Sequence, residues 1–252
     1  PTVFQSKDYT SRQSLSYTNI YVLNCLFRSI TSSNAGGALS LSSVTDLLIE
    51  STSFFSCKTS SGHGGAVYTN CGQCVLHEVC GYDCCSSNTG SSYGQFTYIG
   101  VNNIASSKNY VNYSSMVRCV TENSNTYYTL CIFYGKNYCF SFNSSMNKCG
   151  YGINYLNPIT DSNNIVGSFS YCSITDNIAT SNTCIQLYRE NSKYEIKSCN
   201  ILRNTQPSSS YGIISSWGNS IIQDCCILEN TATYIFWVHS SSYTITLSNC
   251  TV

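Results

Sequence analysis

The sequence predicts an all-β protein built as a parallel β-helix, with three short strands in each of about eight coils of roughly 27 residues. One repeated stretch sets the period: a Cys, an Ile, a charged residue and an Asn recur in Cys172–Asn177, Cys199–Asn204 and Cys225–Asn230. The three isoleucines lie 27 and 26 residues apart, a period typical of stacked supersecondary units. Apolar residues show no sustained helical spacing, and the segments between polar bends are rich in the residues that strands favour.

One predicted strand of each coil carries an apolar register mark equivalent to Ile174. Counting at the repeat period places the marks at Phe27, Phe55, Tyr82, Val117, Met146, Ile174, Ile201, Ile227 and Val252. Two residues before each mark stand Cys25, Ser53, Cys80, Ser115, Ser144, Cys172, Cys199, Cys225 and Cys250. Alternate residues of a strand share one face, so we expect the cysteines of this second column to point inward with the marks.

A second strand follows a bend that usually contains glycine, and a third strand leads into the next mark. The second strands are predicted at Gly36–Leu39, Gly64–Val67, Gly94–Phe96, Gly152–Ile153, Cys184–Leu187, Gly212–Ile213 and Tyr234–Trp237. The third strands are predicted at Leu47–Ile49, Cys74–Leu76, Ile165–Val166, Tyr194–Ile196, Ser220–Ile222 and Tyr243–Ile245. A meander or sandwich is the alternative fold, but only stacked coils must repeat their bends at one fixed period.

The chain is predicted to form a single β-helix domain over residues 1–252. The coil at residues 83–116 is longer than the others by about eight residues, which is typical of a loop inserted on one face of a repeat array. The first and last coils carry strand patterns without obvious caps. We therefore expect a segment of a longer chain or filament, whose ends stack on other copies or on neighbouring repeats.

Composition narrows the function classes. Twelve basic and twelve acidic residues give zero formal charge without a basic stripe, which argues against nucleic acid as a partner. No apolar run reaches the ~20 residues that span a bilayer. Seventeen cysteines indicate an oxidising compartment, so we expect an extracellular or cell-surface protein. The sequons at Asn112, Asn143 and Asn249 are glycosylation candidates and fit that location.

Two short motifs carry a resemblance to a known family. Gly36-Gly37-Ala38-Leu39 and Gly64-Gly65-Ala66-Val67, with the Ile-x-x-Asn stretches ending at Asn177, Asn204 and Asn230, resemble the paired GGA-[ILV] and FxxN motifs of polymorphic outer-membrane-protein repeats. Ile replaces Phe in these stretches. The resemblance implies a right-handed parallel β-helix and a role in display and attachment at the cell surface.

The Asn177, Asn204 and Asn230 column is interpreted as a structural ladder, because asparagine side chains bond backbone at tight bends and stack from coil to coil. The preceding position reads Lys148, Asp176, Arg203 and Glu229, which predicts an ion ladder of alternating sign. Asp176 and Glu229 could instead form the carboxylate pair of a glycoside hydrolase. A cation between them would keep both ionised, which is unsuited to a general acid, so no catalytic residue is assigned.

The cysteines have several alternative roles. Cys25, Cys80, Cys172, Cys199, Cys225 and Cys250 are expected to form an inward column. Disulfides and free thiols are both compatible with it, and we predict a mixture of the two without assigned partners. Cys71 and Cys74, followed by Cys80, Cys84 and Cys85 and flanked by His63 and His77, could bind zinc. In an oxidised chain disulfides or buried thiols are favoured, so no metal and no cofactor is predicted.

Tyrosine provides the predicted contact surface, because exposed tyrosine with Ser, Asn and Gly is common in recognition surfaces. Six tyrosines gather in sequence around the long coil: Tyr110, Tyr113, Tyr127, Tyr128, Tyr134 and Tyr138. The sequence thus predicts a non-enzymatic structural or adhesive surface protein with host-surface or glycan ligands. A polysaccharide lyase or hydrolase and a carbohydrate-binding β-helix are the alternatives.

Overall fold

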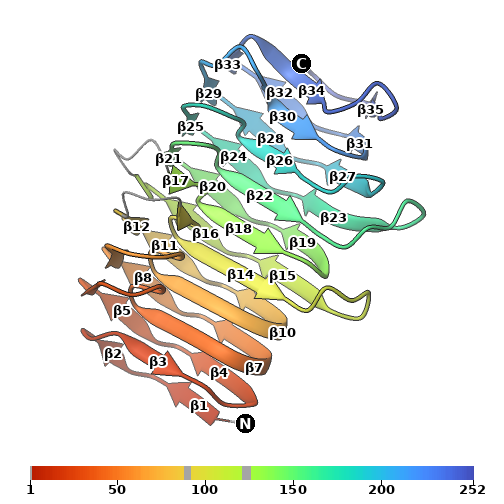
Figure 1. The fold of residues 1–252 in the computed structure, drawn as a ribbon. Coiled ribbons are helices and arrows are strands. Elements are labelled where there is room, and N and C mark those ends of the chain that lie inside the picture. The colour runs from red at the N-terminus through yellow and green to blue at the C-terminus, as the bar shows by residue number, and fades with distance from the viewer. Residues whose placement is uncertain (1, 88–91, 121–125) are drawn as a thin grey trace.

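The computed structural model describes residues 2–87, 92–120 and 126–252 and confirms the predicted fold class. The chain winds as a right-handed solenoid of about eight coils with a spacing of about 27 residues (Figure 1). Every strand pairing in the described part of the chain is parallel. No helix of the length and apolar character needed to cross a bilayer occurs among the described residues.

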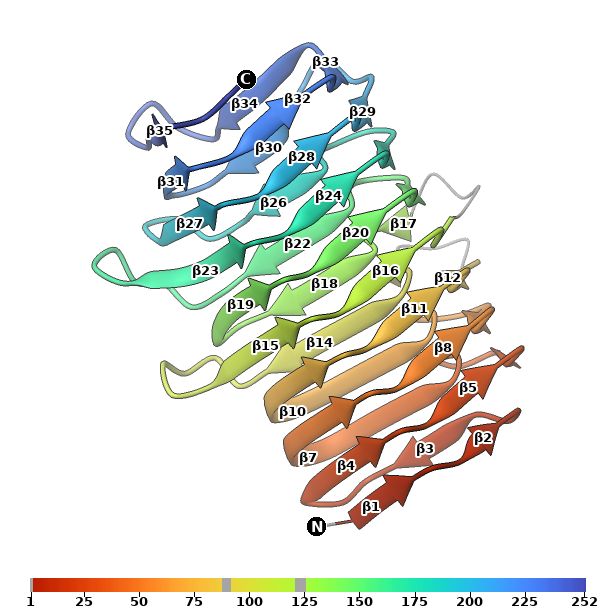
Figure 2. The same cartoon turned by 180° about the vertical axis from the view of Figure 1, so that it is seen from behind.

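The first face of the solenoid is turned to the viewer in Figure 2. Its strands are β1 (Thr2–Gln5), β4 (Asn19–Leu23), the second halves of β7 (Leu39–Glu50) and β10 (Val67–His77), β15 (Lys108–Asn112), β19 (Lys136–Phe140), β23 (Ile165–Ser170), β27 (Lys193–Lys197), β31 (Asn219–Gln223) and β35 (Ile245–Ser248). The second face consists of β2 (Asp8–Tyr9), β5 (Leu26–Arg28), β8 (Ser53–Phe55), β11 (Cys80–Tyr82), β16 (Ser115–Val117), β20 (Asn143–Ser145), β24 (Ser173–Thr175), β28 (Asn200–Leu202) and β32 (Cys226–Leu228).

The third face is turned to the viewer in Figure 1. It consists of β3 (Gln13–Leu15), the first halves of β7 and β10, β14 (Thr97–Val101), β18 (Leu130–Phe133), β22 (Asn154–Asn157), β26 (Ile185–Leu187), β30 (Gly212–Ser216) and β34 (Tyr234–Val238). Two-residue strands connect the second and third faces: β6 (Thr31–Ser32), β9 (Lys58–Thr59), β12 (Cys85–Ser86), β13 (Ser92–Tyr93), β17 (Thr126–Tyr127), β21 (Lys148–Cys149), β25 (Ile178–Ala179), β29 (Thr205–Gln206) and β33 (Thr231–Ala232).

Strand pairing corrects the predicted register marks in four coils. The column that contains Ile174 runs through Phe27, Phe54, Gly81, Met116, Ser144, Ile174, Ile201 and Ile227. Phe55, Tyr82, Val117 and Met146 therefore lie one or two residues outside it. Phe54 is fully buried and stacks on Phe27 with ring centroids 4.8 Å apart, whereas Phe55 is 41% exposed. Glycine holds the position at Gly81 because the ring of Phe96 fills that space, 2.5 Å from where a Cβ would lie.

The GGA bends turn the chain into the third face. Gly36 has a φ of 69° and Gly64 a φ of 67°, in the left-handed region that glycine adopts without steric cost. The following glycine, Gly37, lies so close to the backbone of the next coil that a Cβ would meet the Lys58 carbonyl oxygen at 2.4 Å. Ala38, next in the motif, is fully buried. Conformation thus accounts for the first glycine and close coil packing for the second.

The insertion in the long coil falls at two corners. Lys58 pairs with Cys85 and Val67 pairs with Thr97, so the chain takes nine residues for this passage in one coil and twelve in the next. Residues 88–91 of this passage lie outside the described residues. At the corner between the third and first faces, Cys71 and Cys74 are three residues apart, while β14 and β15 are joined by residues 102–107.

The corner between the first and second faces contains a column in which cysteine, serine and threonine hold seven of the nine positions. The column through Cys25 is Cys25, Thr52, Val79, Ser114, Phe142, Cys172, Cys199, Cys225 and Cys250. The backbone N–H of Cys25 donates to Oγ1 of Thr52 at 3.2 Å, and that of Cys172 donates to Sγ of Cys199 at 3.3 Å. The Cys199 thiol and the Thr52 hydroxyl therefore have the same role, because each accepts a hydrogen bond from a backbone N–H of the neighbouring coil.

Cys80 departs from the expected inward column. It pairs with Ser53 and Ser115 and is half-buried, while Val79 takes the inward position. The register mark in this coil is Gly81 and not Tyr82, which shifts the column by one residue. Cys250 is in the predicted column but is half-buried, and the other four predicted members are buried. All seventeen cysteines fall within the described residues and are free thiols there.

The next corner, between the second face and the short strands, contains the asparagine ladder. Asn177, Asn204 and Asn230 stack with a fourth member, Asn147, and Cys119 continues the column below. Each asparagine above Asn147 accepts, at its Oδ1, both the backbone N–H and the side-chain amide of the asparagine below it. Asn177 and Asn204 are fully buried. Their amides hold the corner from inside.

The residue that turns the chain at this corner is the one before each asparagine. Asp176, Arg203 and Glu229 have φ values of 57°, 53° and 58°. Their side chains project outward as an ion ladder: Arg203 contacts Asp176 at 2.7 Å and Glu229 at 4.0 Å. Lys148, the fourth predicted member, is not in this column, because it pairs with Ile178 and the equivalent position is Met146, which precedes Asn147.

Candidate functional site

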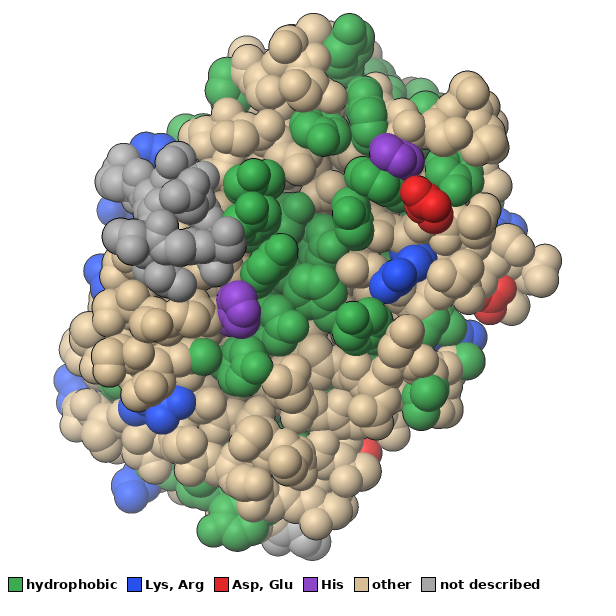
Figure 3. Space-filling view, in the orientation of Figure 1, with side chains coloured by type: hydrophobic (Ala, Val, Ile, Leu, Met, Phe, Trp, Pro, Cys, Tyr) green, Lys and Arg blue, Asp and Glu red, His purple; other side chains and the backbone are tan. Residues whose placement is uncertain are grey.

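A groove lined by aromatic rings crosses the middle of the third face. Figure 3 shows hydrophobic side chains gathered there, with charged and histidine side chains at the margins. The hollow has a volume of about 450 Å³. It is lined by Tyr93, Tyr127, Tyr128, Phe133, Tyr151, Tyr155, Asn157, Asn182, Gln186, Tyr188, Tyr211 and Trp217. We refer to these twelve residues as the aromatic groove.

The groove lies over one column of outward-facing positions on successive strands, of which Tyr155 and Gln186 line the hollow. Cys131, Tyr155, Gln186 and Ser215 pair in register on β18, β22, β26 and β30. Their neighbours in the same strands, such as Leu156, point into the core. All four residues of this column are nevertheless buried. Tyr155 and Cys131 form a second hydrophobic cluster with Tyr128, separate from the core, so the bordering side chains shield what would otherwise be an exposed face.

Two rows of aromatic rings border this column, one stacked and one tilted. On one side Tyr127 lies between Tyr93 and Tyr151, with ring centroids 4.7 and 3.8 Å away. On the other side Tyr188 and Trp217 have centroids 4.4 Å apart. Both rows run along the solenoid axis because each ring is contributed by a different coil. The groove therefore presents ring faces at successive levels to an elongated ligand.

Polar groups accompany the rings. Asn157 and Asn182 are each 7% exposed, and the Oδ1 atom of each has no hydrogen-bond partner in the described structure. Trp217 Nε1 is likewise buried without a partner. Asn157 donates its amide to the Tyr155 hydroxyl at 3.1 Å, and the Tyr128 hydroxyl donates to Gln186. Two acceptors and one donor thus remain for a ligand that carries hydroxyl groups.

The groove is electrically neutral. Burial raises the pKa of the Tyr128 and Tyr155 phenols well above their usual range, and it also raises the pKa of Tyr93. These phenols stay protonated over the physiological range. None of the twelve lining residues is an Asp or a Glu, so the groove lacks the paired carboxylates that glycoside hydrolysis requires.

A second hollow of about 340 Å³ adjoins the groove and shares Tyr188 and Trp217 with it. Its other lining residues are Thr160, Arg189, Glu190 and Asn191. The Glu190 carboxylate lies 3.6 Å from Nε2 of His239, whose ring stacks on Trp217 with centroids 3.4 Å apart. Charge is therefore placed at one end of the groove.

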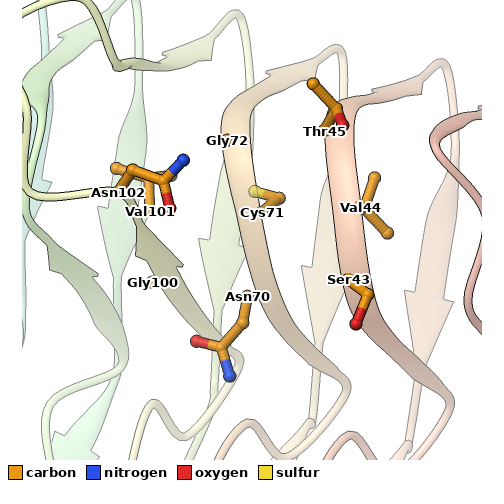
Figure 4. A pocket seen from close by; sticks show the side chains of 9 residues that line it. All are labelled: Ser43, Val44, Thr45, Asn70, Cys71, Gly72, Gly100, Val101 and Asn102. Atoms are coloured by element: carbon orange, nitrogen blue, oxygen red, sulfur yellow. The ribbon is translucent and has the colours of Figure 1, made fainter.

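A third hollow, of about 410 Å³, lies at the corner between the third and first faces (Figure 4). Small and mostly uncharged side chains line it, among them Ser43, Thr45 and Asn70. Cys71 contributes a sulfur, and a hydrogen bond from Cys74 lowers the pKa of the Cys71 thiol despite burial. The site has no aromatic ring and no acid–base pair, so it carries less chemistry than the groove.

The structure gives no support to the carboxylate pair or to the metal site that the sequence offers as alternatives. Asp176 and Glu229 lie on opposite sides of Arg203, whose side-chain hydrogen bond lowers the pKa of Asp176. That carboxylate is held ionised and outside any of the three hollows. Among the described residues no three His, Cys, Asp or Glu side chains are grouped to hold a metal ion.

The sequons and the predicted tyrosine surface are spread over the solenoid. Asn112 and Asn143 are half-buried, whereas Asn249 is exposed and donates to Asp224 at 2.8 Å. Tyr127 and Tyr128 line the groove, but Tyr110 and Tyr138 stack on each other on the first face. Tyr113 and Tyr134 occupy positive-φ positions next to β15 and β18. The six therefore do not form one surface.

Most groove residues were not singled out from the sequence. Tyr93, Tyr155, Tyr188 and Trp217 stand in different coils and are separated by irregular numbers of residues. The sequence contains one partial signal, a tyrosine that recurs at Tyr68, Tyr98 and Tyr155. These three residues and Cys131 form one column of paired strand positions in the structure. Because Cys131 interrupts the tyrosines, the column is recognisable only when the register is known.

Comparisons with protein-family models, curated proteins and solved structures gave no match to this chain.

Proposed function

We propose that this chain is a non-enzymatic extracellular surface protein whose rigid β-helix carries a glycan-binding face. The aromatic groove is the observation that carries the proposal. The motifs that resemble polymorphic outer-membrane-protein repeats support a role in attachment, and the three sequons support an extracellular location. In this reading the solenoid is a stiff support and the third face is its adhesive surface.

The match to a glycan rests on two kinds of contact. Aromatic ring faces carry partial negative charge, and the C–H groups on one side of a sugar ring carry partial positive charge, so the two surfaces stack. The sugar hydroxyls supply donors and acceptors for Asn157, Asn182 and Trp217, whose buried polar atoms have no partner in the described structure. A ring at every level suits a chain of sugars better than a compact ligand.

A polysaccharide lyase or hydrolase remains the competing proposal. Solenoid faces can carry such chemistry, but it needs a positioned base and usually a second charged group. The lining of the groove has no carboxylate, histidine or other charged side chain, and burial raises the pKa of its Tyr93, Tyr128 and Tyr155 phenols, which makes them poor bases. Glu190, in the adjoining hollow, is within ion-pair distance of His239. Binding without turnover is therefore the function that the groove supports best.

Glycan-array binding followed by calorimetry tests the proposal. Trp217→Ala and Tyr188→Ala remove one row of rings and are expected to weaken binding at least about tenfold each, the loss of roughly 1.4 kcal/mol of stacking energy. Tyr171→Ala, which removes a 57% exposed ring outside the groove, is the matched control. Binding that survives both groove variants would refute the site. Turnover of polygalacturonate or a related glycan, with or without calcium, would favour the enzyme.

End-to-end stacking is a separate proposal, carried by the last coil. Ile235 and Phe236 on β34 are half-buried, whereas Ile213 and Ile214 on β30, one coil below, are fully buried. A second copy that added its first coil there, or the neighbouring repeats of a longer chain, would cover these side chains and pair the outer edge of β34. Sedimentation velocity over a hundredfold concentration range should then show association of the wild-type chain. The Phe236→Glu variant should remain monomeric over the same range. A monomer at every concentration contradicts it.

A further inference from the structure

The hollow next to the aromatic groove contains a cation that is fixed in place. The backbone N–H of Arg189 donates to the Tyr194 hydroxyl at 2.7 Å, and that hydroxyl donates back to the Arg189 carbonyl oxygen at 3.3 Å. Tyr194 is fully buried, so the loop is anchored to the core. Nε of Arg189 donates to the Pro158 carbonyl oxygen at 2.9 Å. The guanidinium therefore has little freedom to move.

The charge of Arg189 is not balanced by a neighbouring carboxylate. Glu190, the acid in the same hollow, lies 3.6 Å from His239, and no ion pair joins any described acid to Arg189. The guanidinium lies 5.9 Å from the centroid of the Tyr134 ring, a cation–π contact that leaves its charge uncompensated. With Nε bound to Pro158, its two terminal nitrogens remain for an anion.

We infer that the groove selects glycans that carry a carboxylate, such as chains of uronic acid, and that Arg189 binds this carboxylate. The inference rests on the proposed glycan-binding function and names its ligand class. Tyr188 and Trp217 line both hollows, so a sugar ring stacked on them brings its substituent to Arg189. The paired terminal N–H groups of arginine match the two oxygens of a carboxylate, and one such cation suits one negative charge per site.

Oligogalacturonate and its fully methyl-esterified form are the probes that test this, because they share ring stereochemistry and differ in charge. Calorimetry with the wild-type chain should show at least about a tenfold preference for the acid, as charge-assisted hydrogen bonds contribute. Arg189→Gln should abolish the preference by weakening the acid alone. Arg189→Lys should retain part of it. The preference should also fall as salt rises.

Lys197→Gln provides the matched control, since it removes one positive charge from the first face, on β27. It should leave the preference unchanged. Equal binding of the acid and the ester by the wild type, or an equal loss in Arg189→Gln and Lys197→Gln, would overturn the inference while glycan binding stands. Failure of every glycan to bind would instead overturn the proposed function. A thermal melt establishes that each variant is folded, and Arg189→Lys serves if Arg189→Gln is not.

Discussion

Asn177 and Asn204 lie one directly above the other, and a single oxygen joins them twice. Oδ1 of Asn204 accepts the backbone N–H of Asn177 at 3.1 Å and the side-chain amide of Asn177 at 3.0 Å. The Asn204 amide in turn donates to the Ile174 carbonyl oxygen at 2.8 Å and to Asn230 at 3.0 Å. One buried side chain thus hydrogen-bonds to the coils on both sides of its own.

Asn204→Ala should therefore destabilise the solenoid by about 3 kcal/mol, because it leaves the buried donors of Asn177 and the Ile174 carbonyl unpaired. Urea unfolding followed by circular dichroism measures the change. Asn200→Ala, at an exposed position on the adjacent β28, is the control and should alter stability by less than about 0.5 kcal/mol. Similar losses in the two variants would show that the ladder contributes little.

The period of the fold could be predicted because stacking forces equivalent residues to recur, but the register within a coil was less accessible. At Phe54-Phe55 two adjacent aromatic residues compete for the inward position, and only packing against Phe27 decides between them. At Met146 the apolar side chain suggested a core residue, yet it occupies a positive-φ corner and is 49% exposed. Asn147, aligned with Asn177, was the signal that could have corrected this.

The groove was harder to predict than the ladders. A ladder repeats one residue type at one register position, whereas the groove combines different residue types from several columns. The strand column beneath it is Cys131, Tyr155, Gln186 and Ser215, four residue types with no common chemistry. The column can be recognised as part of a binding surface only from the folded structure, in which the two rows of rings lie beside it. The position of Arg189 next to these rings is likewise visible only in the folded structure.

The Asp176–Arg203 pair should contribute stability that depends on pH. The side-chain hydrogen bond from Arg203 lowers the pKa of Asp176 in the folded chain. This contribution is present above the unfolded pKa of about 3.9 and is lost as pH falls through the lower folded value. Asp176→Asn should thus lower the melting temperature slightly at pH 7, and the difference from wild type should vanish near pH 2. A difference independent of pH would contradict the role of the ion pair.

Cys199 should tolerate serine better than alanine. Its sulfur accepts the Cys172 N–H at 3.3 Å, and its single S–H hydrogen is shared between the Lys197 and Phe169 carbonyl oxygens, 3.2 and 3.4 Å from the sulfur. Serine preserves both functions, as Thr52 does at the equivalent position, whereas alanine leaves a buried N–H unpaired at a cost of roughly 1–3 kcal/mol. Denaturant midpoints of the two variants, with and without reductant, measure this. If Cys199 instead formed a disulfide, both substitutions would destabilise equally and reductant would weaken the wild type.

Thiol reactivity should separate the cysteines by burial. Burial raises the pKa of Cys149 and Cys184 to about 12, and both side chains are inaccessible, so almost no reactive thiolate forms at pH 8. Cys80 and Cys226 are half-buried and therefore reachable. Alkylation of the folded, reduced chain with iodoacetamide, followed by peptide mass mapping, should modify Cys80 and Cys226 within minutes and leave Cys149 and Cys184 intact. The same treatment in urea is the control and should modify all four. Sγ of Cys149 lies 3.4 Å from the Thr126 carbonyl oxygen, so we expect its coil to stay closed. Rapid labelling of Cys149 in the native chain would contradict this and show that the coil opens.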